Sequence, residues 1–435
     1  MIPWLKARLP LERADLQILL AGLLVRLLLM PFAANSDLMH TYWGAHLLVY
    51  RGHLALGFQA LLRLVHAAWL WAISFLLPPA DSLWIRQADA PFLNPFVSPQ
   101  VASTQGWFDF ISQPQVFRTL FLLKLPYLLF DLACLFLIYR LGSHRAESRR
   151  MAAFWWLNPI LIFAVYIFGR HEAIALLFVI LSLTAIRRGK LEGGMLALGV
   201  AIAVRYYAVL LLPFYLFSFR LSWKQRVRAL AIGLAPWLVI NLVSWSLSGS
   251  PEAKGLVNLP HDNYLLSMRF PIAAWDNLYI FPLAYALLLL HRLYNREAGF
   301  ESLVRYGLVA LLLLYATAYT GQSPHYWTWC LPFLAIALAK DGTLLGLHLA
   351  QILCLVVYSF IGGRSTAGYL FAPIAPDFFW SLPSPAETIG RFASVEIVIS
   401  LARTLLSAIT LWMAFWVFRR ARVSLLPDNG QAEAK

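Results

Sequence analysis

The sequence predicts an all-α polytopic membrane protein, a bundle of about 11–13 transmembrane helices with a long first outer loop. Hydrophobic residues make up 60% of the 435 residues and charged residues only 13%, whereas a soluble domain has about 45–50% apolar and about 25% charged residues. The apolar residues also come in long runs rather than in the alternation that is typical of a membrane β-barrel. A soluble enzyme and a disordered chain are thereby excluded.

The apolar runs predict twelve crossings, which form a single transmembrane domain over residues 1–425 with a polar tail at 426–435. The first run, Leu16 to Phe32, lacks the small-residue cleavage site of a signal peptide and is expected to remain as the first helix. An even number of crossings places both termini on the same side. The crossings are predicted at about 14–33, 117–141, 151–168, 172–187, 192–205, 207–219, 228–248, 275–292, 303–320, 326–339, 343–361 and 394–418.

Basic connections indicate which side is cytoplasmic. The positive-inside rule places the termini in the cytoplasm, because most Lys and Arg residues share their side. This distribution accounts for the net charge of +14, so we expect no nucleic-acid partner. The Ala-, Leu-, Arg- and Trp-rich composition indicates a bacterial plasma membrane; a eukaryotic chain would lie in the endoplasmic reticulum. The basic connections are at 144–150, 187–190, 220–228, 291–297 and 418–422.

The outer side carries the long loops, where chemistry is expected because long loops in a compact protein are usually functional. Residues 54–79 are apolar but are interrupted by Gln59, Arg63 and His66. Counting them as a crossing would invert every later connection, so we predict an interfacial helix there. The long outer loops are 34–116, 249–274 and 362–393.

An acidic residue follows the first predicted helix. Asp37 lies in the stretch PFAANSDLMHTYW, at the outer interface. A carboxylate in this place can act as a general base toward an incoming hydroxyl group. The same residue can instead cap a helix that begins near Leu38, and the two roles are compatible.

Three ionisable residues stand together in a predicted outer turn. Arg170, His171 and Glu172 follow Gly169 in VYIFGRHEAIALL. They suit a polar binding site on the same face as Asp37. The alternative is a polar turn in which Glu172 stabilises the next helix through the helix dipole.

Arg205 joins two runs that are short for a crossing, 192–205 and 207–219. Broken helices at membrane depth are tolerated only beside protein or a cavity, so we predict a cavity that opens outward. The planar donors of Arg205 suit a phosphate group, and Tyr206 follows directly. The alternative is a side chain that extends to the interface.

Lys124 and the pair of His325 and Tyr326 are further candidates for contact with an anion. Lys124 and Asp131 lie two turns apart on one face of a predicted helix. Either they form structural bonds within the membrane, or Lys124, nearer the outer end, reaches a lipid phosphate. In GQSPHYWTW, Pro324 predicts a helix start from which His325 and Tyr326 face an anion. The alternative is an aromatic belt at the interface.

Several motifs are missing from the sequence, which contains no GxxxxGK[ST], no GxGxxG between a strand and a helix, and no HExxH. The three cysteines, Cys134, Cys330 and Cys354, lie in apolar runs without metal or disulfide spacing. We therefore expect no bound cofactor and assign no residue as a metal ligand. A divalent metal is the alternative that the sequence leaves open. An activated substrate has to be available at the outer face or within the membrane.

Five stretches follow one another over about residues 30–340: SDLMHTYW, KLPYLLFDLACLFLIYRLG, WWLNPILIFAVYIFGRHEAIALLF, AVRYYAVLLLPFYL and SPHYWTWCLPFLA. Together they resemble the GT-C superfamily of membrane glycosyltransferases. The nearest resemblance is to bacterial polyprenyl-phosphate-mannose-dependent mannosyltransferases and to GPI mannosyltransferase I. Two features depart from the pattern. Ser36 precedes the single Asp37 where many of these enzymes have two acids, and Arg-His-Glu replaces a neutral pair before an acid.

The resemblance implies a GT-C-like bundle that transfers a hexose from a polyprenyl-phosphate donor to a lipid, glycan or protein acceptor. Mannose is the first choice; glucose, galactose and arabinose stay open. The implied transfer inverts the anomeric carbon in one displacement, with Asp37 as the base and Arg205, Lys124 and His325 at the donor phosphate. Binding of the sugar and the acceptor is assigned to Arg170, His171, Glu172, Tyr206 and Tyr326.

A transporter or lipid flippase is the competing interpretation, with Arg205, Lys124 and Asp131 along the substrate path. Against it, the sequence shows no pair of matching halves, the predicted crossings are uneven in length, and the first outer loop is very long. A non-catalytic membrane scaffold is the third interpretation, which leaves the ionisable residues on the outer face unexplained.

Overall fold

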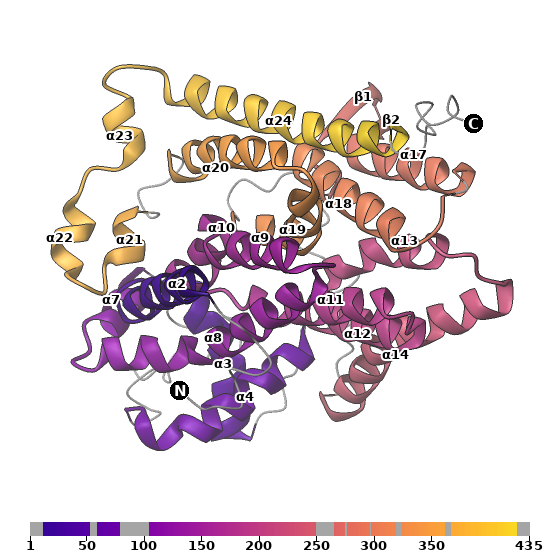
Figure 1. The fold of residues 1–435 in the computed structure, drawn as a ribbon. Coiled ribbons are helices and arrows are strands. Elements are labelled where there is room, and N and C mark those ends of the chain that lie inside the picture. Colours follow the sequence, from indigo (N-terminus) through magenta and orange to yellow (C-terminus); the bar gives the residue numbers. More distant parts are fainter. Residues whose placement is uncertain are drawn as a thin grey trace, which may run out of the picture.

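The computed structural model of the chain describes residues 12–52, 59–78, 104–248, 265–274, 276–295, 297–318, 324–361 and 367–423. Within these residues the chain is mostly helical (Figure 1). The predicted tail at 426–435 lies outside the described residues. So do parts of the three predicted outer loops, at 53–58, 79–103, 249–264 and 362–366.

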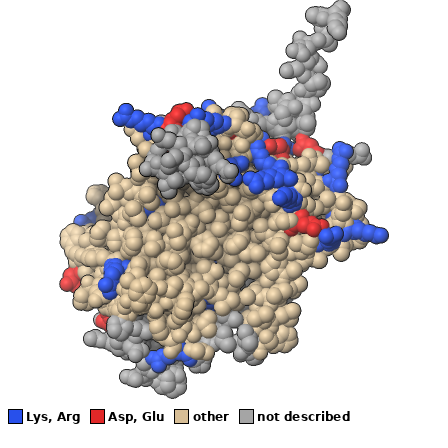
Figure 2. Space-filling view, turned by 60° about the horizontal axis from the view of Figure 1, so that its bottom comes forward, with Lys and Arg blue, Asp and Glu red and all other residues tan. Residues whose placement is uncertain are grey.

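Several helices are long and apolar enough to cross a membrane. Figure 2 shows a broad surface without charged residues, with charged side chains at its margins. These features are those of a multi-pass α-helical membrane protein. A bent pair, α9 (Arg145–Trp156) with the helical residues Pro159–Ile167, is a further candidate span. The five single helices are α2 (Arg13–Phe32), α8 (Val116–Leu141), α14 (Trp223–Ser248), α18 (Phe300–Thr317) and α24 (Val395–Val423).

The remaining predicted crossings are also helical but shorter. Of the twelve, five single helices of the described chain, or six with the bent pair, have the length and apolarity of a span. The prediction of short, broken helices on either side of Arg205 is confirmed by α12, η4 and α13. The shorter elements are α11 (Glu172–Arg187), α12 (Leu191–Val204), η4 (Tyr206–Leu211), α13 (Leu212–Phe217), α17 (Ile280–Tyr294), η5 (Pro324–Cys330), α19 (Leu331–Lys340) and α20 (Thr343–Ile361).

One predicted crossing starts too early. Two antiparallel strands, β1 (Arg269–Ala273) and β2 (Asp276–Tyr279), precede α17. Phe270 and Ile272 favour an extended chain, and Asp276 is a poor residue for the interior of a helix. The helix therefore begins only at Ile280, so the predicted start of this crossing at residue 275 was wrong, while the described chain is mostly helical as predicted.

The described part of the first outer loop contains α3 (Ser36–Arg51) and α4 (Ala60–Ile73), with the 3-10 turn η1 (Ser74–Leu76) after α4. The two helices pack against each other. α4 buries His66 against the protein and exposes Trp71 on its other side. The predicted helix within 54–79 is thus present, and its two-faced surface fits an interfacial position.

The end of the chain returns along the bundle. α20 and α24 run side by side and pack together, and α18 packs against α24 (Figure 1). Three short helices connect them, at the end of the bundle where α7 (Thr104–Ile111) also lies. They are α21 (Ala367–Phe371), α22 (Pro376–Ser381) and α23 (Pro385–Ile389).

A buried ion pair joins α2, α8 and α9. The Arg26 Nε donates to Asp131 Oδ2 at 2.8 Å, and both side chains are fully buried. Asp131 also accepts from Trp155 Nε1 at 2.8 Å and from the Tyr166 hydroxyl at 2.7 Å. The Arg26 guanidinium lies 3.6 Å from the ring centroid of Trp156. A buried charge is costly unless it is paired and hydrogen-bonded, and this carboxylate meets both conditions.

Lys124 has a similar structural role. Its Nζ donates to the backbone carbonyls of Met30 at 3.0 Å and Tyr166 at 2.9 Å, and also to that of Ala33. An ammonium group has three donors, and three carbonyls take them. Of the two sequence interpretations, the structure thus favours structural bonds within the membrane, and it partners Asp131 with Arg26 rather than with Lys124.

This arrangement gives a testable prediction. Lys124→Met is expected to lower the thermal stability of the detergent-solubilised protein, because three buried carbonyls lose their donor. Thermal unfolding would be compared with that of Lys224→Met, an exposed lysine near the start of α14. A variant as stable as the wild type, with selectively weaker binding of a lipid phosphate, would instead return Lys124 to the donor site.

Candidate functional site

A sharp turn carries Arg170, His171 and Glu172, the three ionisable residues identified from the sequence. Pro159 starts the short helix α10 (Pro159–Ile162), which continues as a single π-helical segment, η3 (Phe163–Ile167). Such π segments are frequent at functional sites. The turn ends at Gly169, whose φ of +81° favours glycine. A Cβ at this position would lie 3.3 Å from the Cβ of Leu38, so the turn packs closely on α3.

Asp37 and Arg170 form an ion pair at the rim of the site. The Arg170 Nη1 donates to Asp37 Oδ2 at 2.9 Å. The Asp37 side chain keeps 35% of its surface exposed, and the Arg170 side chain 12%. Asn35 is the residue that caps α3, since its side chain accepts from the Asp37 backbone N–H at 2.9 Å. The capping interpretation of Asp37 was therefore wrong, and its partly exposed carboxylate pairs with Arg170 instead.

His40 lies one helical turn beyond Asp37 on α3. Burial lowers the pKa of its imidazole, and the cations Arg63 and Arg170 add to this effect, which the attraction of Asp37 opposes. At neutral pH His40 is therefore uncharged, since a lowered pKa leaves the neutral form dominant. The negative charge at this rim belongs to Asp37.

Glu172 lies deeper, at the centre of a second cluster. Its Oε1 pairs with the Arg205 guanidinium, and its Oε2 accepts from Trp329 Nε1 at 2.8 Å. His325 Nε2 lies 3.9 Å from Oε1. The Tyr207 ring stacks on the Trp329 ring with a centroid distance of 3.8 Å. Residues from three distant segments thus meet at one buried carboxylate.

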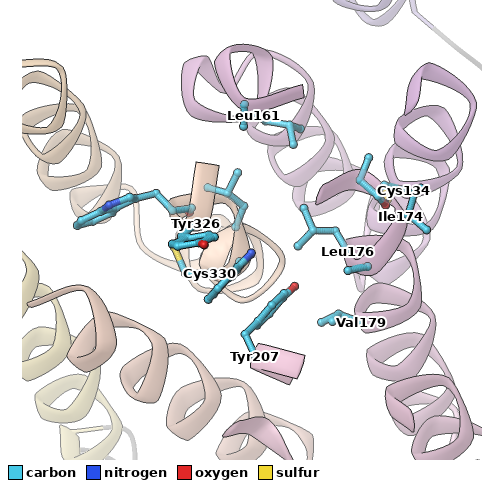
Figure 3. Close-up of a cluster of buried hydrophobic side chains, with 14 of the residues drawn as sticks. Cys134, Leu161, Ile174, Leu176, Val179, Tyr207, Tyr326 and Cys330 are labelled. Atoms are coloured by element: carbon cyan, nitrogen blue, oxygen red, sulfur yellow. Dashed lines mark hydrogen bonds between the residues drawn. The ribbon is translucent and has the colours of Figure 1, made fainter. Parts of the chain in front are cut away.

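Arg205 reaches this cluster because the chain changes conformation there. α12 ends at Val204, Arg205 is extended, and η4 begins at Tyr206. The Arg205 guanidinium also lies 5.9 Å from the ring centroid of Tyr326. Figure 3 shows Tyr207 and Tyr326 opposite Leu176 and Val179 of α11, within a cluster of buried hydrophobic side chains. The Arg205 side chain is buried and does not extend to an interface.

Buried donors exceed buried acceptors here. Within the described residues no hydrogen-bond partner is found for either ring nitrogen of His171, for Nε of Arg205 or Arg170, or for the Tyr207 hydroxyl. Both oxygens of Glu172 are already engaged. Buried donors in folded proteins nearly always have a partner. The excess of N–H and O–H groups therefore favours a ligand rich in acceptor oxygens, such as a phosphate.

The structure brings most of the predicted site residues together. Asp37 and Arg170 lie at the rim, and the buried cluster lies in the turn and helices directly behind them. Tyr206 is half-buried beside Arg205. Lys124 is the exception: it lies under the turn, where its Cε would be 3.5 Å from a Cβ on Gly169, and its donors are engaged. The residues of the buried cluster are His171, Glu172, Arg205, His325 and Tyr326.

Sequence reasoning missed two members of the buried cluster. Trp329 was considered only under the alternative of an interfacial aromatic belt, but it is buried and donates to Glu172. Tyr206 was assigned to the site, whereas its neighbour Tyr207 was not. The sequence could have indicated them only through their positions in the stretches AVRYYAVLLLPFYL and SPHYWTWCLPFLA. It does not show which aromatic ring of a stretch contacts a buried acid. In the described chain no group of three or more His, Cys, Asp or Glu residues is placed to hold a metal ion.

Comparisons of the chain with protein-family models, with curated proteins and with solved structures found no match. The function is therefore argued from the residues and their geometry.

Proposed function

We propose that this chain is a membrane glycosyltransferase that transfers a hexose, with mannose as the first choice, from a polyprenyl-phosphate donor to a lipid or glycan acceptor. The observation that carries the proposal is the excess of buried donors around Arg205 and His171, next to a partly exposed carboxylate, Asp37. The first feature suits a phosphate and the second suits a base. A glycosyl transfer from a lipid phosphate needs both.

The donor phosphate is assigned to the buried cluster. Glu172 holds the Arg205 guanidinium in place and leaves the Arg205 Nε free of a described partner. A phosphate beside it would accept from this Nε, from His171 and from the Tyr207 hydroxyl. Fixed donors in a site without water stabilise the negative charge that develops on a leaving group, at no cost of reorganisation.

Asp37 is assigned the role of base. Its carboxylate takes the proton of the acceptor hydroxyl as that oxygen bonds to the anomeric carbon of the sugar. The bond between this carbon and the phosphate oxygen breaks at the same time, and its electron pair leaves with the polyprenyl phosphate. Arg170 orients the carboxylate through the ion pair. One displacement inverts the anomeric configuration.

The membrane setting supports a lipid-linked donor. The chain has a broad uncharged surface (Figure 2) and no nucleotide-binding motif. The basic connections are expected on the cytoplasmic side, so the Asp37 end is proposed to face outward. There a donor built on a lipid remains available, whereas nucleotide sugars stay in the cytoplasm.

The test is a transfer assay with the protein in lipid nanodiscs. Polyprenyl-phosphate-[14C]mannose is incubated with the protein and a membrane lipid extract, and labelled products are separated by chromatography. Transfer of label to an extracted lipid supports the proposal. Movement of a lipid phosphate across proteoliposomes without any transfer would overturn it in favour of a transporter, for which a buried ionic cluster is also suited.

A conservative variant tests the phosphate site. Tyr207→Phe removes only a hydroxyl group that has no partner in the described structure, so stability should be unchanged. The donor KM is expected to rise about tenfold, the effect of about 1.4 kcal/mol for one lost hydrogen bond to an anion. Tyr215→Phe is the matched control, because this buried tyrosine of α13 lies away from Glu172, next to Ser182. Equal donor kinetics in both variants would remove Tyr207 from the site.

A further inference from the structure

A pocket lies at the end of the bundle that carries Asp37. It opens to the surface and has a volume of about 680 Å3, between the end of α7, the start of α8, and Pro373 with the start of α22. This volume is within the range of about 300–1,000 Å3 typical of small-molecule sites. Both walls come from segments predicted to be outer loops, 34–116 and 362–393.

The chemistry of the lining limits what the pocket can bind. Polar groups come from Ser112, Gln113 and Asp377, and apolar surfaces come from Phe108 and Phe117, among others. No Lys, Arg or His is among the residues that line it. A phosphate or carboxylate ligand would meet an acid without a cation, which disfavours it. A purely apolar chain would displace water from Ser112 and Asp377, which are exposed, without replacing its hydrogen bonds.

A neutral sugar satisfies both conditions. Its hydroxyl groups can donate to the Asp377 carboxylate and exchange hydrogen bonds with Gln113 and Ser112, while its C–H surfaces pack on the phenylalanine rings. A charge-assisted hydrogen bond to a carboxylate is among the stronger bonds available to a hydroxyl group. Small-molecule sites generally combine apolar walls with a few polar groups in this way.

The pocket is connected to the rim of the site. Trp107 of α7 stacks on Tyr369 of α21 with ring centroids 5.0 Å apart. The Ala34 backbone N–H donates to the Leu370 carbonyl at 2.9 Å, three residues before Asp37. The hydroxyl group of Tyr369 interacts with Ser36, and burial raises its pKa. The α7 and α21 segments thus connect the pocket to the start of α3.

We propose that this pocket binds a neutral saccharide, namely a sugar unit of the acceptor that lies next to the unit receiving the hexose. The inference rests on the proposed transferase function for its role, but the binding itself does not depend on catalysis. In this proposal Asp377 and Gln113 determine the specificity for the acceptor, whereas Arg205 binds the donor.

Saturation-transfer NMR on the full chain in nanodiscs tests the binding directly. The probes are methyl α-mannopyranoside and mannobiose, with glycerol 3-phosphate as the anionic comparison. The wild type should give saccharide signals and weaker ones for the phosphate. Asp377→Ala and Gln113→Ala should each raise the apparent Kd for mannobiose about tenfold or more. Glu396→Ala is the matched control, because Glu396 is also an exposed acid in the first turn of a helix.

Two results would overturn the inference: no saccharide signal in the wild type, or signals that are the same in Asp377→Ala and in the control. Either can occur while the transfer assay succeeds, in which case the transferase proposal stands alone. Conversely, saccharide binding that depends on Asp377 without any sugar transfer supports the pocket and removes the proposed function. In an active protein, Asp377→Ala should raise the acceptor KM and leave the donor KM unchanged.

Discussion

Asp37→Asn is expected to lower sugar transfer by about 10²–10⁴-fold, because an amide cannot take the proton of the acceptor hydroxyl. The substitution keeps the size of the side chain and the cap that Asn35 supplies to α3. It loses a partly exposed ion pair with Arg170, which is worth about 0–1 kcal/mol, so the protein should remain folded. Initial rates of [14C]mannose transfer in nanodiscs, together with thermal unfolding, measure both effects.

Glu396→Gln is the control for this variant. Glu396 is an exposed acid in the first turn of α24, so its replacement removes the same kind of charge from a helix start. It should transfer sugar at the wild-type rate. Unchanged transfer in Asp37→Asn would contradict the assigned base. Glu172 would be a poor replacement, because it is buried and both of its oxygens are engaged.

The helices could be predicted from the sequence because the bilayer leaves few choices. Apolar runs of sufficient length must satisfy their backbone groups internally, and a helix does this. The runs at 14–33 and 117–141 agree with α2 and α8 within a residue or two. The predicted start of the crossing at 275–292 was wrong because its first few residues belong to the strand β2. Hydropathy does not show where such a short extended segment ends and the helix begins.

Side-chain partners could not be predicted from the sequence. Lys124 and Asp131 share a helix face, but Asp131 pairs with Arg26, which is 105 positions away. The spacing on one helix says which side chains point the same way and nothing about which neighbouring helix meets them. The π-helical segment before Gly169 was not predicted either, and its Tyr166 donates to Asp131 of another helix, α8.

The candidate site was predicted better than its internal contacts. Asp37, Arg170 and Glu172 were singled out because they are ionisable residues on the same predicted outer face, and the structure places them in one region. The sequence could not show that Glu172 is buried with Arg205 while Asp37 stays partly exposed. That difference in burial separates the structural acid from the proposed base.

The buried pair of Arg26 and Asp131 should dominate the stability of the α2–α8–α9 region. Arg26→Met or Asp131→Leu alone is expected to cost about 3–5 kcal/mol, because each leaves one uncompensated buried charge. Asp131→Leu also removes the acceptor of Trp155 and Tyr166, so it should be the more damaging of the two. Thermal unfolding and resistance to proteolysis in detergent measure the loss.

The double variant Arg26→Met with Asp131→Leu separates the charge from the packing. Removing both charges should recover most of the lost stability, since replacing a buried pair by apolar residues of similar size is often neutral or stabilising. The exposed pair of Arg228 and Glu192 is the control, and Arg228→Ala should change stability by no more than about 1 kcal/mol. If the double variant is as unstable as the worse single one, the hydrogen bonds of Asp131 to Trp155 and Tyr166, rather than the ion pair, hold α9 and η3 in place.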